Sequence, residues 1–333
     1  KYNSNLILSK NLGIKNNFKN IKKYILLFFN KKVLYNDIIS ETNLIFYRKL
    51  KLEILSTSNI YNEIISDQIK ILLSKLNIKN LLITYEGYSI ERIIINKVKK
   101  NNLSTYCMAY NHSGIWSGQN SIKINMKKSY NPDIIFFAGK IHKDRFFSNS
   151  KIEVQTDILG SNRNFRVLKK KNKKLTVLFL PEGILSEAKI MLSFATKLSS
   201  LHKNIDFVIR FHPALNSHIK KLHHINSKFK NLKFSKNNFN DDLSIANIAI
   251  YRGSTTCVAA LSNEIIPVYY DLNDNINIDF LYDLNEFKFT IKNENELNKI
   301  INNYNKIMNQ FYVNKKQIED YCLGLFDNKI YFD

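Results

Sequence analysis

The chain has 333 residues, 44% of them hydrophobic and 12% aromatic, so it is too apolar to be disordered and long enough for two domains. Its 50 Lys and Arg residues against 28 Asp and Glu residues give a formal net charge of +22, but this charge is dispersed and no nucleic-acid-binding motif accompanies it. No run reaches the roughly 18 apolar residues of a membrane span, and the distant Cys107, Cys257 and Cys322 indicate reduced thiols rather than a disulfide framework.

Two interpretations of the excess positive charge remain open. Lysine can simply solvate the surface of a protein whose codon usage is biased toward Lys, Asn and Ile. The charge can also attract the chain to an anionic membrane face or an anionic glycolipid acceptor. We therefore expect a cytoplasmic protein, with attachment to the inner face of the inner membrane as the alternative, and no nucleic-acid partner.

The first half of the chain predicts β-α-β units. The early apolar run Tyr24 to Phe29 is interpreted as a buried strand, because it is short and no signal-peptide cleavage site follows it. Further on, apolar runs predict strands, and a periodic segment between two of them predicts a helix. The predicted strands are 81–84, 104–109 and 134–138, and the predicted helix is 89–100.

The second half alternates more regularly. The lysine-rich run 169–174 is typical of a linker, and the continuous apolar strand 175–180 that follows is typical of a parallel sheet buried on both faces. The next segments predict strands at 207–209, 232–234, 248–250 and 265–270, and helices at 186–201, 217–228, 240–246 (capped by Asn240 or Asp241), 254–263, 294–307 and 315–323.

This pattern predicts two Rossmann-like domains with parallel sheets. We assign residues 1–163 to an N-terminal acceptor-side domain, 164–174 to a linker and 175–333 to a C-terminal nucleotide-binding domain. In two-domain proteins of this shape, the last helix often packs back on the first domain. Ligands of such sheets bind at the carboxyl ends of the strands, so we expect a cleft there between the domains.

Two motifs in the second half predict an anion site. Arg210-Phe211-His212-Pro213 ends one predicted strand, and Arg252-Gly253-Ser254-Thr255-Thr256 joins another strand to a helix. Gly253 permits a tight turn, and the hydroxyls and N–H groups of a helix start favour phosphate. Arg252 adds a guanidinium, and the His212 imidazole can donate to a phosphate oxygen. The alternatives are an ordinary helix cap and a structural histidine.

His218, His223 and His224 follow on the next predicted helix. No cysteine or carboxylate is placed to complete a zinc site with them, so we expect no metal.

A carboxylate motif lies in the first half. Glu86 and Gly87, within Tyr85-Glu86-Gly87-Tyr88, follow a predicted strand and precede a helix. A carboxylate in this position suits a general base or a nucleophile, and the alternative is a turn residue. Glu91, on the helix, is expected to pair with Arg92 or a nearby lysine.

Three further segments are candidate ligand loops. Residues 111–119 are rich in glycine and small polar groups in a glycine-poor chain and contain the only tryptophan. In this loop His112 is a candidate for binding an acceptor hydroxyl or a donor carboxylate. The other candidates in the loop are Ser113, Gly114, Trp116 and Gln119. In the second segment, Pro181, Glu182 and Gly183 are candidates for holding a base or ribose. In the third, Arg163 is a candidate for holding a donor anion. The alternative for the loop is a structural one, with Trp116 in the core.

Taken together, residues 80–270 resemble GT-B glycosyltransferases, and more narrowly the bacterial transferases that use CMP-activated keto-sugars. These are the sialyltransferases and the Kdo transferases of capsule, O-antigen and lipopolysaccharide assembly. The matching motifs are Glu86-Gly87, His212-Pro213 and Ser254-Thr255-Thr256. The chain departs from these families at Tyr85, where an acidic residue is common.

The resemblance implies a metal-independent transferase that needs no cofactor beyond its CMP-sugar donor, with Kdo preferred over sialic acid. His212, Ser254 and Thr255 would bind the CMP phosphate, and Glu86 would be the catalytic carboxylate, a nucleophile in a retaining enzyme and a base in an inverting one. The acceptor would be a glycan or glycolipid, contacted by Gly87, Tyr88 and the 111–119 loop.

Two alternatives remain. The CDP-glycerol polymerases of teichoic acid synthesis share the His-Pro and Ser-rich motifs, but they carry an acidic residue where Arg252-Gly253 stands here. A non-catalytic module that binds nucleotide-sugars or anionic glycans is the alternative outside the enzymes.

Overall fold

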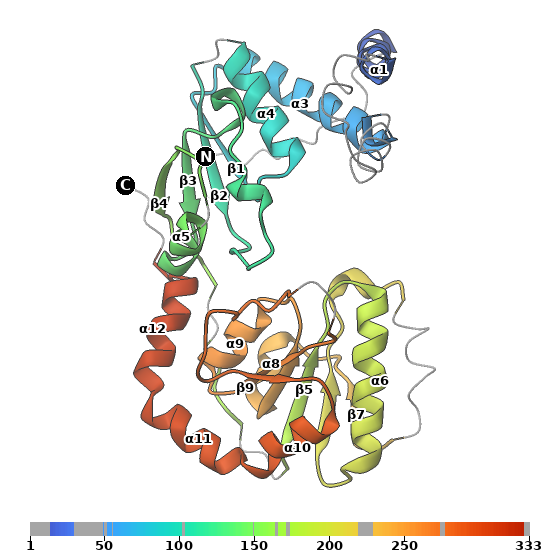
Figure 1. The fold of residues 1–333 in the computed structure, drawn as a ribbon, viewed down its shortest axis with the longest axis vertical. Coiled ribbons are helices and arrows are strands. Elements are labelled where there is room, and N and C mark those ends of the chain that lie inside the picture. The colour runs from blue at the N-terminus through green and yellow to red at the C-terminus, as the bar shows by residue number, and fades with distance from the viewer. Residues whose placement is uncertain are drawn as a thin grey trace, which may run out of the picture. The chain divides into compact units, whose positions relative to one another are not determined.

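The computed structural model describes residues 14–29, 49, 52–54, 56–101, 104–148, 150–163, 166–170, 174–218, 229–273 and 277–329. The chain divides into two compact units (Figure 1). The first comprises residues 1–111, 121–136 and 149–157, and the second comprises residues 112–120, 137–148 and 158–333. Each unit is built on its own sheet.

The first sheet has the order β1-β2-β3-β4. Its strands are β1 (Asn80–Thr84), β2 (Tyr106–Asn111), β3 (Ile134–Phe137) and β4 (Gln155–Ile158). β1 and β2 are parallel, with Asn80 opposite Tyr106 and Thr84 opposite Tyr110. Helix α4 (Ser89–Lys100) connects them and packs against α3 (Thr57–Lys75), which Ser56 caps. The predicted strands and helix of this region are confirmed within a few residues.

The early apolar run is not a strand. Tyr24 to Phe29 form the last turns of α1 (Ile14–Phe29), so that prediction is wrong. Only Tyr24 of this run is buried, and Leu26 and Phe29 are exposed. A short apolar run does not distinguish a strand from a helix, and the preceding 3–4 residue spacing of Phe18 and Ile21 carried the helical signal.

The second sheet has the order β10-β9-β8-β5-β6-β7, and all its neighbouring strands are parallel. The strands are β5 (Thr176–Leu180), β6 (Asp206–Ile209), β7 (Leu232–Phe234), β8 (Ile248–Tyr251), β9 (Ile266–Tyr270) and β10 (Phe289–Ile291). Every residue of β5, β8 and β9 is buried, as expected for a parallel sheet covered on both faces.

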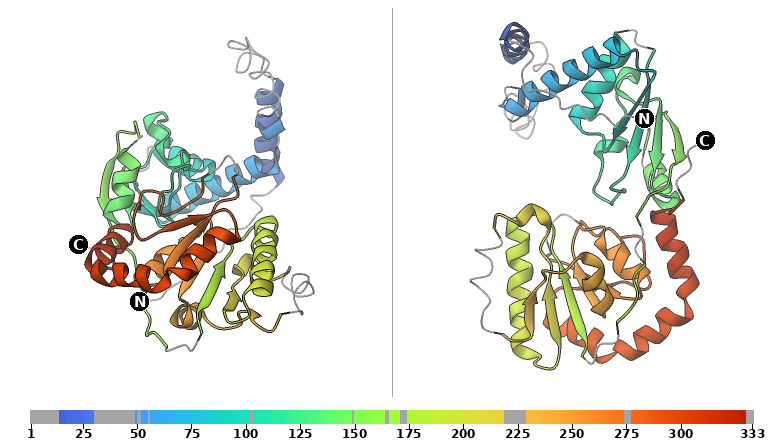
Figure 2. Two further views of the ribbon diagram at one scale, coloured as in Figure 1. Left: turned by 60° about the horizontal axis from the view of Figure 1, so that its bottom comes forward. Right: turned by 180° about the vertical axis from the view of Figure 1, so that it is seen from behind.

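Helices connect these strands. They are α6 (Leu185–Leu201), α8 (Phe239–Ile245) and α9 (Thr256–Ser262), with a 3₁₀ turn, η4 (Pro213–Leu215), after β6. Figure 2 shows α6 lying along the sheet from two further directions. The predicted helix at 217–228 lies largely outside the described residues.

Two predicted helix starts need correction. The side chain of Asn238, not Asn240 or Asp241, caps α8 by accepting a hydrogen bond from the Asp241 N–H at 2.9 Å. Helix α9 begins at Thr256 rather than Ser254, because the intervening residues complete the turn after β8.

Three helices end the described chain. α10 (Glu294–Asn302), α11 (Tyr304–Val313) and α12 (Lys315–Leu325) follow β10. α12 packs on α9 and on α5 (Lys140–Phe147), a helix from the N-terminal half of the sequence that belongs to the second unit. A Cβ at Gly139 would overlap the backbone of α12 at Gly324 and Leu325, so the two helices meet at a close backbone approach.

Two lysines of the predicted linker are also held by the second unit. Lys169 Nζ donates to the Ala246 carbonyl at 2.7 Å, and the Lys170 N–H donates to the Ser244 carbonyl at 2.9 Å. Both contacts satisfy carbonyls at the end of α8. Among the residues that the structure describes, no helix is long and apolar enough to cross a membrane.

Candidate functional site

The strand order of the second sheet changes direction between β5 and β8. From β5 the chain proceeds outward through β6 and β7, and from β8 it proceeds the opposite way through β9 and β10. In open α/β sheets, ligands bind outside the carboxyl ends of the strands at such a switch point. Leu180 and Tyr251 are paired at this point, so the segments that follow them, 181–183 and 252–256, form the centre of the candidate site.

Glu182 and Gly253 meet across the switch point. A Cβ at position 253 would overlap the Glu182 carboxylate in its present position, so the glycine lets this carboxylate approach the turn closely. Burial raises the pKa of Glu182, and the positive charge of Arg252 and the His212 ring partly offset that rise. The Glu182 carboxylate therefore faces both predicted phosphate motifs.

His212 joins the same edge from β6. Its Nδ1 accepts a hydrogen bond from the Ala214 N–H at 3.1 Å, which makes it the cap of η4. A Cβ at Gly183 would lie 3.1 Å from this Nδ1, so the two residues are neighbours. Because Nδ1 accepts from the backbone, the proton of the neutral ring is on Nε2, and the exposed ring can donate it to a ligand.

The hydroxyls before α9 are partly engaged with one another. Ser254 Oγ accepts from the Thr256 hydroxyl at 2.8 Å and from the Thr256 N–H at 3.3 Å. Thr255 Oγ1 accepts from Arg163 Nη1 at 3.1 Å, and the Arg163 guanidinium stacks on the Phe326 ring at 4.5 Å. Arg163 thus places a cation beside the predicted phosphate motif.

The other two arginines of the motifs point elsewhere. Arg252 is 2% exposed, donates to the Tyr270 carbonyl at 3.0 Å and forms an ion pair with Glu187 at 3.2 Å. Arg210 pairs with the fully buried Asp242 at 2.9 Å. Carboxylates and carbonyls of the second unit therefore bind both guanidinium groups, the buried one of Arg252 and the partly exposed one of Arg210.

The first unit holds Glu86 in a rigid turn. The Glu91 carboxylate accepts hydrogen bonds from the N–H groups of Glu86 at 3.0 Å and Tyr88 at 2.8 Å. Glu91 therefore organises this turn, and the predicted pairing with Arg92 or a lysine is wrong. Burial raises the pKa of Glu91, although the backbone donors favour its charged form.

Arg92 and Gly87 complete the turn. Arg92 is 4% exposed, and its Nε donates to the Gly87 carbonyl at 3.0 Å. Gly87 has a φ of +81° and leaves no room for a Cβ against the backbone of Ser121 and Ile122, so only glycine fits. The Ser121 hydroxyl donates to the Glu86 carbonyl at 2.6 Å.

The Glu86 side chain itself remains half-buried at the end of β1. Its hydrogen bond with the Tyr88 phenol is the largest cause of a raised Tyr88 pKa. Tyr85, at the position where the resembled families commonly carry an acid, is fully buried, with the Arg92 guanidinium 5.7 Å from its ring centre. The turn therefore presents one carboxylate, that of Glu86, beside an exposed phenol.

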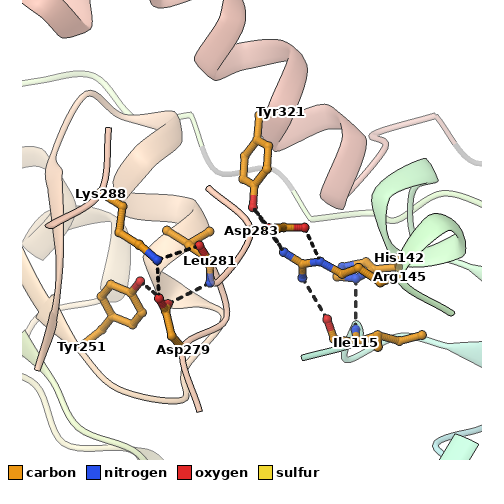
Figure 3. Close-up of polar contacts among 9 residues, drawn as sticks. All are labelled: Ile115, His142, Arg145, Tyr251, Asp279, Leu281, Asp283, Lys288 and Tyr321. Atoms are coloured by element: carbon orange, nitrogen blue, oxygen red, sulfur yellow. Dashed lines mark hydrogen bonds and ion pairs between the residues drawn. The ribbon is translucent and has the colours of Figure 1, made fainter. Parts of the chain in front are cut away.

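Of the predicted loop 111–119, Asn111 ends β2 in the first unit, and residues 112–119 belong to the second unit. The Ile115 N–H donates to His142 Nδ1 at 3.0 Å, and the Ile115 carbonyl accepts from Arg145 Nη1 at 2.8 Å (Figure 3). Gly114 has a φ of +83° and lies against the His142 and Phe280 rings. His142 and Arg145 of α5 thus fix the loop backbone.

Within this loop, His112 is exposed, Trp116 is half-buried and Gln119 is buried. Gln119 Oε1 accepts no hydrogen bond from the residues that the structure describes. The Ser113 hydroxyl donates to the Gly114 carbonyl at 3.5 Å. Trp116 is therefore neither fully in the core nor fully in solvent.

The sequence did not reveal an ionic network beside this loop, in which the buried Arg145 meets the partly exposed Asp283. The Asp283 carboxylate accepts hydrogen bonds from two of the three Arg145 guanidinium nitrogens, Nε at 2.8 Å and Nη2, and from the Tyr321 hydroxyl at 2.6 Å (Figure 3). Although burial raises it, the net pKa of Asp283 is lowered by these donors. The i, i+3 spacing of His142 and Arg145 was the one local signal, and their partner Asp283 is distant in sequence.

No protein-family model matches the sequence, and no curated protein is significantly similar to it. Solved structures do match the fold. One is a proposed UDP-N-acetylglucosamine 2-epimerase from Listeria monocytogenes, with a TM-score of 0.54, 11% identity and coverage of 82% of this chain and 77% of that chain. Another is S. aureus MnaA in complex with UDP, with a TM-score of 0.52, 11% identity and coverage of 93% and 90%.

A third is the Methanocaldococcus jannaschii UDP-GlcNAc 2-epimerase in complex with UDP-GlcNAc and UDP, with a TM-score of 0.50, 12% identity and 74% of each chain covered. At this identity the likeness speaks for the fold. Together with two parallel α/β sheets of four and six strands, it confirms the predicted architecture: the chain has the GT-B fold.

Proposed function

We propose that this protein is a glycosyltransferase that uses a nucleotide-activated sugar in bacterial surface polysaccharide synthesis. The observation that carries the proposal is the convergence of Glu182, His212 and residues 252–256 at the switch point of the second sheet. This is where a Rossmann-like sheet binds its ligand. The Nε2–H of His212 and the Arg163 guanidinium beside Thr255 suit a donor phosphate.

The donor that we propose is a CMP-activated keto-sugar, with Kdo preferred over sialic acid. Its support is the order of the Glu86-Gly87, His212-Pro213 and Ser254-Thr255-Thr256 motifs. The titles of similar structures name UDP and UDP-GlcNAc as ligands of those proteins, so a UDP-sugar is the competing donor. We keep CDP-glycerol as a third candidate donor, because the CDP-glycerol polymerases share two of the motifs.

Glu86 is the proposed catalytic carboxylate. Its backbone is fixed on both sides, by Glu91 at the N–H and by Ser121 at the carbonyl, so its side chain starts from a defined position. In a retaining reaction the carboxylate attacks the anomeric carbon as CMP leaves. In an inverting reaction it takes the proton of the acceptor hydroxyl.

Calorimetric titration with CMP, UDP and CDP tests the nucleotide site. We expect CMP to bind most tightly and His212→Ala to weaken binding about tenfold, as for loss of one hydrogen bond to a charged group. His202→Ala is the matched control, because His202 lies at the opposite end of α6 and should leave affinity unchanged. Tighter binding of UDP would replace the CMP assignment, and binding of none of the three would contradict the proposal.

Turnover assays with CMP-Kdo, CMP-sialic acid, UDP-GlcNAc and CDP-glycerol test the reaction. Release of CMP from CMP-Kdo with a glycan acceptor is the expected outcome. Nucleotide binding without turnover of any donor would favour the non-catalytic binding module instead.

A further inference from the structure

Helix α1 turns polar side chains toward its neighbour α3, the reverse of an ordinary amphipathic helix. Polar groups join it to α3: Lys23 Nζ donates to Glu63 at 2.6 Å, the Tyr24 hydroxyl to Glu63 at 3.2 Å, and the Asn20 amide to Asp67 at 3.4 Å. A surface helix normally turns its apolar stripe toward the core. Here a largely polar stripe does so.

The apolar stripe of α1 is exposed instead. Phe18, Ile21, Ile25 and Phe29 are 70%, 39%, 44% and 72% exposed. Their spacing of three and four residues places them on one side of the helix. We call these four residues the α1 apolar face. Exposed apolar surface of this kind marks a site of association.

A cationic stripe runs beside this face. Lys19 and Lys22 are exposed, the Lys23 side chain is 52% exposed, and the sequence of α1 contains no Asp or Glu. Leu26, 61% exposed, lies among these lysines. The exposed side of α1 therefore pairs an apolar half with a half whose only charged side chains are cationic.

This pairing identifies the partner by its charge. A second copy of the chain would bring another lysine stripe and another net charge of +22 against the first, so self-association is disfavoured. An anionic bilayer offers acyl chains to the aromatic and branched side chains and phosphates to the lysines, which is how interfacial amphipathic helices bind.

We propose that α1 docks this protein on anionic lipid membranes, with the α1 apolar face in the headgroup–acyl boundary and Lys19 and Lys22 at the lipid phosphates. The ion pair of Lys23 with Glu63 holds the helix so that this face points away from α3. The proposal does not depend on the glycosyltransferase assignment.

Vesicle co-sedimentation of the full chain tests it. We expect binding to vesicles of phosphatidylcholine with about 30% phosphatidylglycerol, weakened by salt, and little binding to phosphatidylcholine alone. The triple variant Phe18→Ser, Ile25→Ser, Phe29→Ser should lose more than about tenfold in partitioning. The double variant Lys19→Glu, Lys22→Glu should lose a comparable factor on anionic vesicles.

A matched control removes exposed apolar surface elsewhere. Tyr312 and Val313 of α11 are 75% and 80% exposed, and Tyr312→Ser with Val313→Ser should leave vesicle binding unchanged. Circular dichroism melts verify that each variant is folded. Absence of vesicle binding, or binding that the triple variant retains, would overturn the proposal. Self-association in sedimentation velocity that the triple variant abolishes would assign the face to a second copy instead.

Discussion

Single residues determine the two candidate turns. Gly87 is required by the Ser121–Ile122 backbone and by its positive φ, whereas Gly253 lets the Glu182 carboxylate approach the turn closely. The scarcity of glycine in the sequence was a sound signal for both turns, because each glycine stands where another group lies within 3.0 Å of the position that a Cβ would take. The role of Glu91 could not be predicted from the sequence, because the N–H groups that donate to its carboxylate come together only in a turn whose conformation depends on Arg92 and Ser121.

His142 predicts a pH dependence of stability at the residue scale. Burial and the nearby Arg145 charge hold its pKa well below the usual range, and its Nδ1 must stay unprotonated to accept the Ile115 N–H. Below the unfolded-state pKa of about 6.5, the unfolded chain binds a proton that the folded chain does not. The His142 contribution to the free energy of unfolding should therefore fall by about 1.4 kcal/mol between about pH 7.5 and about pH 5.5.

Denaturant titrations followed by Trp116 fluorescence check this, because Trp116 lies beside the Ile115 contact. In His142→Gln, the loss in the free energy of unfolding between about pH 7.5 and about pH 5.5 should be smaller by about 1.4 kcal/mol. The exposed His112 supplies the control, and His112→Gln should keep the full pH dependence. An unchanged slope in His142→Gln would contradict the argument.

At the scale of elements, hydrophobic periodicity and strand composition located most helices and strands, but they did not determine the residues at which helices begin. Helix α8 illustrates the limit. Asn238, Asn240 and Asp241 are all good capping residues, and only the turn after β7 decides that Asn238 has the backbone angles of a cap, with φ −70° and ψ 164°. For α1, the short apolar run 24–29 was compatible with a strand or a helix. Only the packing against α3 shows which of its residues are covered.

We predict that Asn238→Ala lowers the free energy of unfolding by about 1 kcal/mol, because the Asp241 N–H loses its acceptor. Asn240→Ala, two residues further along and exposed, should change the free energy of unfolding by less than about 0.5 kcal/mol. Thermal or urea denaturation of the two variants measures the difference. Equal effects would mean that the cap does not contribute as the geometry indicates.

At the scale of the whole molecule, the candidate groups belong to two compact units. Glu86 lies in the first, whereas His212, Glu182 and residues 252–256 lie in the second. If the proposed function holds, catalysis and nucleotide binding should be separable by substitution. We expect Glu86→Gln to lower transfer at least about 10³-fold while nucleotide affinity stays within about twofold.

Glu91→Gln is the companion variant in the same turn. It should weaken the Glu86 turn and lower stability, because an amide replaces the carboxylate that accepts the Glu86 and Tyr88 N–H groups. Titration calorimetry, product analysis and melting curves on both variants distinguish these effects. Loss of nucleotide binding in Glu86→Gln would remove Glu86 from the catalytic role.

The sequence by itself determined the class of fold and the order of the motifs. Continuous apolar runs indicate buried parallel strands, and glycines indicate tight turns at strand ends. Both patterns are local properties of the sequence. Tertiary structure alone decided which motif residues face one another. It placed Glu182 against Gly253, paired Arg252 with Glu187 and Arg210 with Asp242, and joined Arg145 to Asp283. These contacts join residues far apart in sequence, so they depend on how the strands and helices are arranged.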